Sequence, residues 1–307
     1  MYKWKKLGLI FDPTDRYDWM KTHATTPTPI VLKGNFYRVF FSTRNKINQN
    51  QTGYIDLDIS KPNEILNISK TPVIKIGDLG TFDCDGIYLT TITKFENKLY
   101  GYYGGWNAGQ RGLFYSKIGL AISEDNGLTF KKYSKAPILN IDHIDPLSVM
   151  APFVIFNDGI WKMWYASAIK FFYERDQLKS YYTIKYATSL NGIDWFKSNE
   201  ICLPLGIKDS NIARACILKE MSYYKSWYPV VDRLTGQYRI GYAESKDGVI
   251  FNRKDELSGI SKSKVGWDSE AITYPYVIKH ESELLMFYNG NNFGKEGFGL
   301  AKCMINE

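Results

Sequence analysis

Acidic residues recur at matched positions along this chain of 307 residues, five or seven residues before an apolar segment. Two opposed carboxyl groups are what cleavage of a glycosidic bond needs, because one is protonated to assist the leaving group and the other is ionised as nucleophile or base. Crowding of the two groups pushes their pKa values apart and so assigns the roles. We predict three catalytic carboxylates, Asp85, Glu270 and Asp145. The segments that carry them are Phe82-Asp83-Cys84-Asp85, Trp267-Asp268-Ser269-Glu270 and Ile144-Asp145-Pro146-Leu147.

The two acids of one segment cannot both act independently, because residues two apart in a strand point to the same side. We expect the acid nearer the strand, Asp85 or Glu270, to face a shared central pit, while Asp83 or Asp268 braces it. An aspartate in the turn before a strand can instead cap backbone N–H groups without any catalytic role, and this alternative stays open for each acid. The first unit has no carboxylate at this place and carries His23 there.

Polar and aromatic residues near the same strand ends are candidates for holding a sugar. Tryptophan stacks on a sugar ring where it is not packed in the core, and arginine binds acidic groups or phosphate. Arg214 stands out as a ligand-binding candidate because other units carry neutral residues at its inner-strand position. A salt bridge to an acidic residue of a neighbouring blade would explain it equally well. The predicted substrate-binding residues are His23, Arg44, Trp106, Asn107, Arg214, Asp268, Asn289 and Asn291.

These residues can meet only if the fold brings distant segments together, and a repeat in the sequence indicates how. An apolar strand with a central small residue recurs, and its clearest copies run into an Asn-Gly or Asp-Gly turn. A pair of strand-like segments precedes each copy, with matched positions at 29, 90, 152, 215 and 275 and steps of 61, 62, 63 and 60 residues. Fixed-period repeats of short strands are typical of propellers. The copies lie at 53–57, 118–123, 184–189, 240–245 and 298–302.

The repeat predicts an all-β fold, namely a five-bladed β-propeller of four-stranded antiparallel blades in one domain over residues 1–307. The last unit lacks an outer strand, and residues 2–11 have the pattern of one. We therefore expect the N-terminal strand to complete the C-terminal blade and close the ring, which leaves no sheet edge unpaired. The largest irregularities, at 104–117 and 169–180, are predicted as loops. Inner strands of all blades would run beside one axis, so equivalent residues would converge on one pit.

Composition narrows the classes of partner. The net charge of +7 is spread along the chain rather than clustered, which argues against nucleic acid but is compatible with an anionic glycan or sugar nucleotide. The four cysteines form no C-x-x-C pair, so we expect neither a metal site nor a cofactor. We find no signal peptide and no apolar run long enough for membrane insertion. These features predict a cytoplasmic protein with free thiols, whose oligomeric state stays open.

The chain resembles the five-bladed propeller enzymes of glycoside hydrolase families 43, 32, 68 and 130, and the likeness spans its whole length. It also resembles propeller proteins encoded beside bacterial surface-polysaccharide genes. The resemblance implies three acidic residues in the pit: a general acid, a base or nucleophile, and a third carboxylate that tunes them. Asp12-Pro13 is similar to the N-terminal acidic motif of family 32, but no Asn-Asp-Pro-Asn-Gly or Arg-Asp-Pro occurs. The segments that carry the resemblance are 105–107, 118–121, 267–270, 274–277, 286–291 and 298–301.

Three functions follow as hypotheses. The first is an enzyme that cleaves or transfers a glycosidic bond, in bacterial glycan or surface-polysaccharide metabolism. The second, which family 130 implies, is a glycoside phosphorylase or nucleotide-sugar glycosyltransferase with a cationic pocket made from Arg214, Arg44 and His23. The third is a non-catalytic propeller that binds a glycan or a protein. Residues 123–130 also fit the Asp-box of sialidases, a family that implies six blades, which the five units disfavour.

Overall fold

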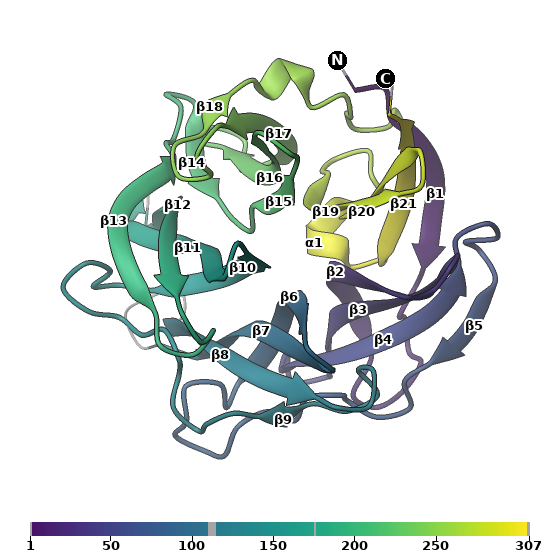
Figure 1. The fold of residues 1–307 in the computed structure, drawn as a ribbon, viewed down its shortest axis with the longest axis horizontal. Helices are drawn as coiled ribbons and strands as arrows, with labels where there is room; N and C mark the ends of the chain where they lie inside the picture. The colour runs from purple at the N-terminus through teal and green to yellow at the C-terminus, as the bar shows by residue number, and fades with distance from the viewer. Residues whose placement is uncertain (1, 110–114, 175, 306–307) are drawn as a thin grey trace.

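The computed structural model describes residues 2–109, 115–174 and 176–305, and this part of the chain is almost entirely β-structure (Figure 1). The all-β prediction is confirmed. In the described residues the strands form five consecutive groups, each paired antiparallel within itself. The first group contains β2 (Thr22–Lys33), β3 (Phe36–Arg44), β4 (Asn50–Asp58) and β5 (Ile65–Ile68). The second contains β6 (Gly86–Phe95), β7 (Lys98–Asn107), β8 (Tyr115–Ser123) and β9 (Lys131–Lys132).

The third group is the longest, and the fourth has its inner strand divided in two. The third contains β10 (Val149–Asn157), β11 (Ile160–Glu174), β12 (Gln177–Ser189) and β13 (Phe196–Leu203). The fourth contains β14 (Asp209–Ile212), β15 (Cys216–Lys219), β16 (Tyr224–Asp232), β17 (Tyr238–Ser245) and β18 (Asn252–Arg253), and the short helix η1 (Asp255–Leu257) follows it. The fifth contains β19 (Thr273–His280), β20 (Glu283–Asn289) and β21 (Phe298–Met304), with the short helix α1 (Asn291–Gly294) between the last two.

The N-terminal strand β1 (Lys5–Phe11) pairs antiparallel with the C-terminal strand β21. Lys6 lies opposite Ala301, so the fifth group receives its fourth strand from the other end of the chain. Figure 1 shows the two termini side by side at this seam. Ahead of β1, Tyr2 and Trp4 pack edge-on against Trp227 of the fourth group, with ring centroids 5.0 and 6.0 Å apart. The predicted pairing of the N-terminal segment is therefore observed.

A hydrogen bond between a serine and a glycine explains why the third strand of three groups ends in a similar sequence. The serine at the end of the third strand accepts a hydrogen bond from the N–H of a glycine in the following turn, at 2.8 to 2.9 Å. Each glycine has a positive φ, which residues with a Cβ rarely adopt. A tight turn then returns the chain as the fourth strand. The pairs are Ser123 with Gly127, Ser189 with Gly192 and Ser245 with Gly248.

The inner strands β2, β6, β10, β15 and β19 gather around the centre of the molecule (Figure 1). Neighbouring groups are joined there by side chains that bond to backbone carbonyls. Thr26 donates to Leu89 O at 3.3 Å, and Thr90 donates to Pro152 O at 2.6 Å. These bonds satisfy buried polar groups that the inner strands do not pair with each other.

In each of three groups, a buried Asp–Tyr–Lys triad connects strands of that group. The tyrosine hydroxyl donates to the aspartate at 2.8 to 3.1 Å, and a lysine of the outermost strand forms a salt bridge with the same carboxylate. The aspartate thus links the turn before the inner strand to both the second and the fourth strand. The triads are Asp83–Tyr103–Lys132, Asp145–Tyr165–Lys197 and Asp268–Tyr288–Lys6.

In the first group the corresponding positions are apolar. Met20 and Phe41 are fully buried in one cluster, and Ile68 packs against that cluster. Trp19 confirms the correspondence, since its ring lies against Gly53 as the Trp267 ring lies against Gly299. Three apolar side chains therefore replace the whole triad together, which avoids an unpaired buried charge. This accounts for the missing carboxylate of the first unit.

The predicted loop at 169–180 is wrong. β11 and β12 continue as a paired hairpin from Lys170 opposite Tyr181 to Glu174 opposite Gln177. Aromatic residues at alternate and adjacent positions favour strand pairing here, and the rings of Phe172 and Tyr181 stack with centroids 4.8 Å apart. Of the other predicted loop, β7 and β8 take up both ends, and 110–114 lies outside the described residues.

Candidate functional site

The pairing of the strands aligns one end of each group, so that residues at these ends lie at a common level. In the first two groups a single row runs from Arg44 to Asn50, then to Gly86 and Trp106. The step from Asn50 to Gly86 is a parallel bridge between the two groups. A matching row in the third and fourth groups runs from Tyr182 through Asn211 and Val231 to Tyr238, again with a parallel bridge between groups.

The fifth group joins the same level on both sides. Ile272 N donates to Tyr238 O at 3.4 Å, and Asn289 Nδ2 donates to Ala24 O at 2.8 Å. These contacts connect the first group with the second, the third with the fourth, and the fifth with both the fourth and the first. Most predicted site residues lie in this row or within two residues of it, so the register brings together residues that are far apart in sequence.

Asp85 and Glu270 lie at this level on the second and fifth groups. Asp85 is half-buried; its backbone N–H bonds to Trp106 O at 3.2 Å, and its carboxylate accepts a bond from Ala108 N at 2.7 Å. Glu270 is exposed, and its carboxylate has no partner among the described residues. Asn291 fixes the backbone of this segment by accepting from Glu270 N at 2.8 Å. The two acids are thus accessible, whereas Asp83 and Asp268 brace the framework beneath them.

Four tyrosines from four groups face one another near the same end, namely Tyr88, Tyr182, Tyr238 and Tyr274. Tyr238 and Tyr274 have ring centroids 6.1 Å apart. Burial, and then the neighbouring Tyr274, raise the pKa of Tyr88 and of Tyr238 above the usual value. The phenols therefore stay protonated and can donate hydrogen bonds to sugar oxygens while their rings offer apolar contact.

Three basic side chains gather beside these tyrosines. Burial, and then the charges of Arg44 and Lys295, lower the pKa of His23 to about 4. Burial also lowers the pKa of Arg44, and the nearby Tyr274 partly offsets this. No acidic residue contributes to either shift, and neither side chain forms a salt bridge with a described residue. An arrangement of basic groups without a carboxylate partner suits an anionic ligand group.

Trp106 and Asn107 end β7 at the same level, and both are half-buried. A Cβ at Gly86 would lie 2.2 Å from Trp106 Nε1, so the glycine lets the indole lie across the start of the inner strand. The carbonyl oxygen of the Asn107 side chain is buried without a partner among the described residues. These two residues stay candidates for substrate contact.

Four other predicted site residues have structural partners instead. Asp145 is fully buried and accepts bonds from Tyr165 and Ser167 besides its lysine. Burial opposes its ionisation, but bonds from Ser167 and Lys197 outweigh this and hold the pKa of Asp145 below its usual value. Asp268 is held in the triad that contains Lys6. We therefore leave both acids out of the proposed site.

Arg214 and Asn289 serve the centre of the fold. Arg214 is fully buried and donates to the carbonyls of Pro27, Tyr274 and Pro275, which joins the fourth group to the first and fifth. Burial lowers its pKa to about 10, so it remains charged at neutral pH. The predicted alternative, a salt bridge, is also not formed. Asn289 is fully buried and accepts from Thr26 N at 2.9 Å, so we leave both residues out of the proposed site.

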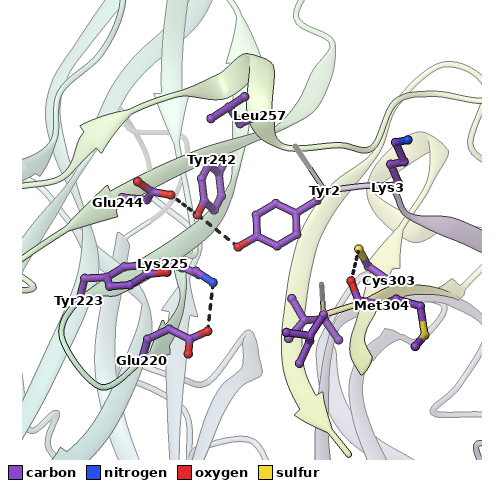
Figure 2. A pocket seen from close by; sticks show the side chains of 12 residues that line it. Tyr2, Lys3, Glu220, Tyr223, Lys225, Tyr242, Glu244, Leu257, Cys303 and Met304 are labelled. Carbon is purple, nitrogen blue, oxygen red and sulfur yellow. Dashed lines mark hydrogen bonds and ion pairs between the residues drawn. The ribbon is translucent and has the colours of Figure 1, made fainter. Parts of the chain in front are cut away.

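A cavity of about 510 Å³ lies away from this end, between the fourth and fifth groups (Figure 2). Tyr2 points into it toward Tyr242, and two of its charged side chains pair with each other. Lys225 donates to Glu220 at 3.1 Å. No predicted site residue lines it. In the described part of the chain, no three His, Cys, Asp or Glu side chains gather so as to hold a metal ion.

Sequence reasoning missed Lys295 and the four tyrosines. Tyr88 and Tyr274 follow Asp85 and Glu270 by three and four residues, at the start of the inner strands, so the spacing of the repeat could have identified them. Lys295 lies in the segment between β20 and β21, which has no counterpart in the repeat, and its nearness to His23 follows only from the fold. No helix in the described residues is long and apolar enough to span a membrane.

Two proteins of Mycobacterium tuberculosis match the chain over nearly its whole length. "Uncharacterized protein MT1551" of strain CDC 1551 / Oshkosh is 33% identical over 299 residues, which cover 97% of this chain and 98% of the relative. "Uncharacterized protein Rv1502" of strain ATCC 25618 / H37Rv gives the same identity and coverage. No protein-family model matches the chain.

Solved structures of glycoside hydrolase-like propeller proteins share the fold. The protein in a structure of a BT0996–RGII complex is 18% identical with a TM-score of 0.76, covering 97% of this chain and 90% of that protein. A structure described as "Glycoside hydrolase" is 16% identical with a TM-score of 0.75, covering 98% and 91%. One from work on the GH130 family of mannoside phosphorylases is 14% identical with a TM-score of 0.70, covering 98% and 93%. At these identities the likeness establishes the fold.

Proposed function

This chain belongs to the family of the Mycobacterium tuberculosis protein Rv1502, and we propose that it is a carbohydrate-active enzyme that cleaves or transfers a glycosidic bond. We further propose that the five strand groups are the blades of one propeller domain over residues 1–307, with β1 closing the ring. The observation that carries the functional proposal is the row of strand ends, which sets the accessible acids Asp85 and Glu270 around the same centre as the tyrosines.

Each set of site residues has a chemical role in this proposal. Asp85 and Glu270 form the acid pair, one protonating the leaving oxygen and the other acting as base or nucleophile. Asn291 is a positioning residue, because it holds the backbone beneath Glu270 without reaching the reacting atoms. The protonated tyrosines donate to sugar hydroxyls, and Trp106 offers an apolar face to the ring. The mannoside phosphorylases and hydrolases among the structural neighbours show that this fold supports such chemistry in other proteins.

The experiment is a panel of aryl glycosides and nucleotide sugars, assayed with the wild type, Glu270→Gln and Asp85→Asn. The proposal expects turnover of at least one substrate and a loss of about 10²-fold or more in kcat for each variant. Glu281→Gln is the matched control, since Glu281 is exposed in the turn at the opposite end of β19. Unchanged turnover in both site variants would exclude these carboxylates from catalysis.

A specific observation favours phosphorolysis as the second candidate. Arg44 and Lys295, which both act on His23, supply positive charge without an acidic partner among the described residues. A phosphate bound there would replace water as the attacking group, so that the product would be a sugar phosphate. The same panel with and without inorganic phosphate separates the two reactions. Phosphate-dependent turnover that Arg44→Gln weakens through a higher KM for phosphate would favour the phosphorylase, and turnover independent of phosphate would exclude it.

A further inference from the structure

The hairpin of β11 and β12 forms an arm that the other groups lack. Beyond the pair Ala168–Tyr182, which lies in the row of the candidate site, the two strands continue to Glu174 and Gln177. The arm therefore projects from the same end of the molecule as Asp85 and Glu270. The residues that pair with each other in the arm lie outside the repeated segments, so the packing of the repeated strands does not depend on the arm.

A cavity of about 640 Å³ lies between the arm and the fourth group. The fourth-group wall is formed where Arg233 N donates to Lys208 O at 2.8 Å, beyond the pairs Asn211–Val231 and Asp209–Asp232. This volume is in the range of small-ligand sites. The lining residues are Glu174, Gln177, Lys179, Ile207, Lys208, Arg233 and Leu234.

Positive charge dominates this cavity. Lys179, Lys208 and Arg233 line it against the single carboxylate of Glu174, and none of the three cations forms a salt bridge with a described residue. All three are exposed. A concave surface lined by cations of one sign focuses positive potential and attracts anions.

Adjacent residues of β12 connect the side of the cavity with the tyrosines of the candidate site. The guanidinium of Arg233 lies 5.6 Å from the ring of Tyr181, and the next residue, Tyr182, belongs to the tyrosine group. Two apolar side chains, Ile207 and Leu234, are almost fully exposed at its edge. A sugar chain presents apolar ring faces and polar substituents together, which matches such a mixed lining better than a single small anion does.

We propose that the arm and the fourth group bind the anionic units of an acidic polysaccharide whose neighbouring unit occupies the site between Asp85 and Glu270. The cations would pair with carboxylate or sulfate groups of the glycan, and Ile207 and Leu234 would contact its ring faces. This inference rests on the proposed function for where the neighbouring sugar unit lies, but binding of the anionic units does not require turnover. It assigns the substrate class as anionic rather than neutral.

Calorimetric titration tests this with three probes: a galacturonic-acid tetrasaccharide, a sulfated tetrasaccharide and a neutral glucose tetrasaccharide. The proposal expects at least one anionic probe to bind about tenfold tighter than the neutral one, with affinity that falls as salt rises. The triple variant Lys179→Gln, Lys208→Gln, Arg233→Gln should lose about tenfold in that affinity.

The matched control is Lys33→Gln, Lys94→Gln, Lys246→Gln, which removes the same charge from exposed lysines near the opposite ends of the strands. This control should keep the wild-type affinity. Failure of both anionic probes to bind, or equal losses in the two triple variants, would overturn the proposal. Tighter binding of a single-stranded oligonucleotide than of either anionic glycan would overturn it as well, in favour of a nucleic-acid site.

Glu270→Gln separates this inference from the proposed function. The loss of affinity caused by the triple variant of Lys179, Lys208 and Arg233 should be the same in the Glu270→Gln background as in the wild type, because Glu270 does not line the cavity. If the protein binds the glycan but no substrate in the activity panel is turned over, the binding proposal stands and the enzymatic one fails.

Discussion

At the scale of single residues, burial separates the two acids of each repeated segment. Asp83 and Asp268 are almost fully buried and are held by a tyrosine and a lysine, whereas Asp85 is half-buried and Glu270 is exposed. The sequence allowed this division to be predicted, because the residue nearer the strand was expected to face the centre. It did not allow the role of Asp145 to be predicted, since the lysines that neutralise it lie 40 and 52 residues further along the chain.

Asn291 provides a test of positioning. Its side-chain oxygen accepts from the N–H groups of Glu270 and Ala271, and its amide donates to Gly266 O. Asn291→Ala should release this segment and lower kcat about tenfold while KM changes little, because binding groups on other strands are intact. Asn291→Asp, which keeps the accepting oxygen, should recover most of the rate. Equal losses of kcat in both variants would contradict a positioning role through these bonds.

His23 makes a prediction about pH. Its pKa is lowered to about 4 in the folded state from an ordinary 6.5, so the unfolded chain binds the proton more readily between these values. Its contribution to folding is therefore present above pH 6.5 and is lost as the pH falls toward 4. Urea unfolding at pH 7 and pH 4.5 should show a smaller loss for His23→Gln than for the wild type. His143→Gln, an exposed control, should behave as the wild type.

At the scale of strands, the triads explain how each group holds its outermost strand. The aspartate precedes the inner strand, the tyrosine lies on the second and the lysine on the fourth, so one carboxylate links three elements. The repeated Asp and Tyr were visible in the sequence, but their partnership was not. Tyrosine and aspartate in each triad are twenty residues apart, a spacing that joins them only after the hairpin is paired.

The first group indicates how a triad can be replaced. Asp83→Asn alone should lower the free energy of unfolding by about 3 kcal/mol, because Lys132 loses its charged partner. The triple change Asp83→Met, Tyr103→Phe, Lys132→Ile copies the residues of the first group and should recover most of that loss. Urea unfolding of the two variants measures both values. A triple variant no more stable than Asp83→Asn would show that the apolar set works only in its own surroundings.

The arm shows where strand prediction failed. Residues 169–180 were expected to form a loop because they break the repeat, yet their aromatic residues pair across a hairpin. Departure from a repeat therefore indicated an insertion but not its structure. The same departure explains why the basic cavity could not be foreseen, since its walls come from this insertion and from a turn of the next group.

At the scale of the whole molecule, the two ends of the chain depend on each other. β1 covers the edge of β21, and Lys6 supplies the charge that neutralises buried Asp268. Deletion of residues 2–11 should expose that edge and leave Asp268 unpaired, and we expect a much lower unfolding temperature and aggregation on heating. Calorimetry of the deletion variant, with Lys5→Gln as a control that keeps the strand, tests this. A deletion variant as stable as the control would contradict closure through β1.

The all-β architecture followed from the repeat period, because strand length and turn chemistry are local and recur along the sequence. The roles of the polar residues at the centre did not follow from the repeat period. Arg214 and Asn289 were expected to meet a ligand, but their polar atoms bond to backbone that only the assembled inner strands bring near. A polar residue at an inner strand can serve either purpose, and only the identity of its neighbours decides between them.

The central claim is that the strand ends assemble one site from the second and fifth groups, and a bound glycan tests it most directly. We would determine the crystal structure of Glu270→Gln with an oligosaccharide that the wild type cleaves. The account predicts a glycosidic oxygen between the side chain of Asp85 and the substituted side chain at position 270, whose carboxyl and amide carbons would lie about 5–10 Å apart. A glycan seated only in the cavity beside Tyr2, or these two side chains on opposite sides of an empty centre, would contradict it.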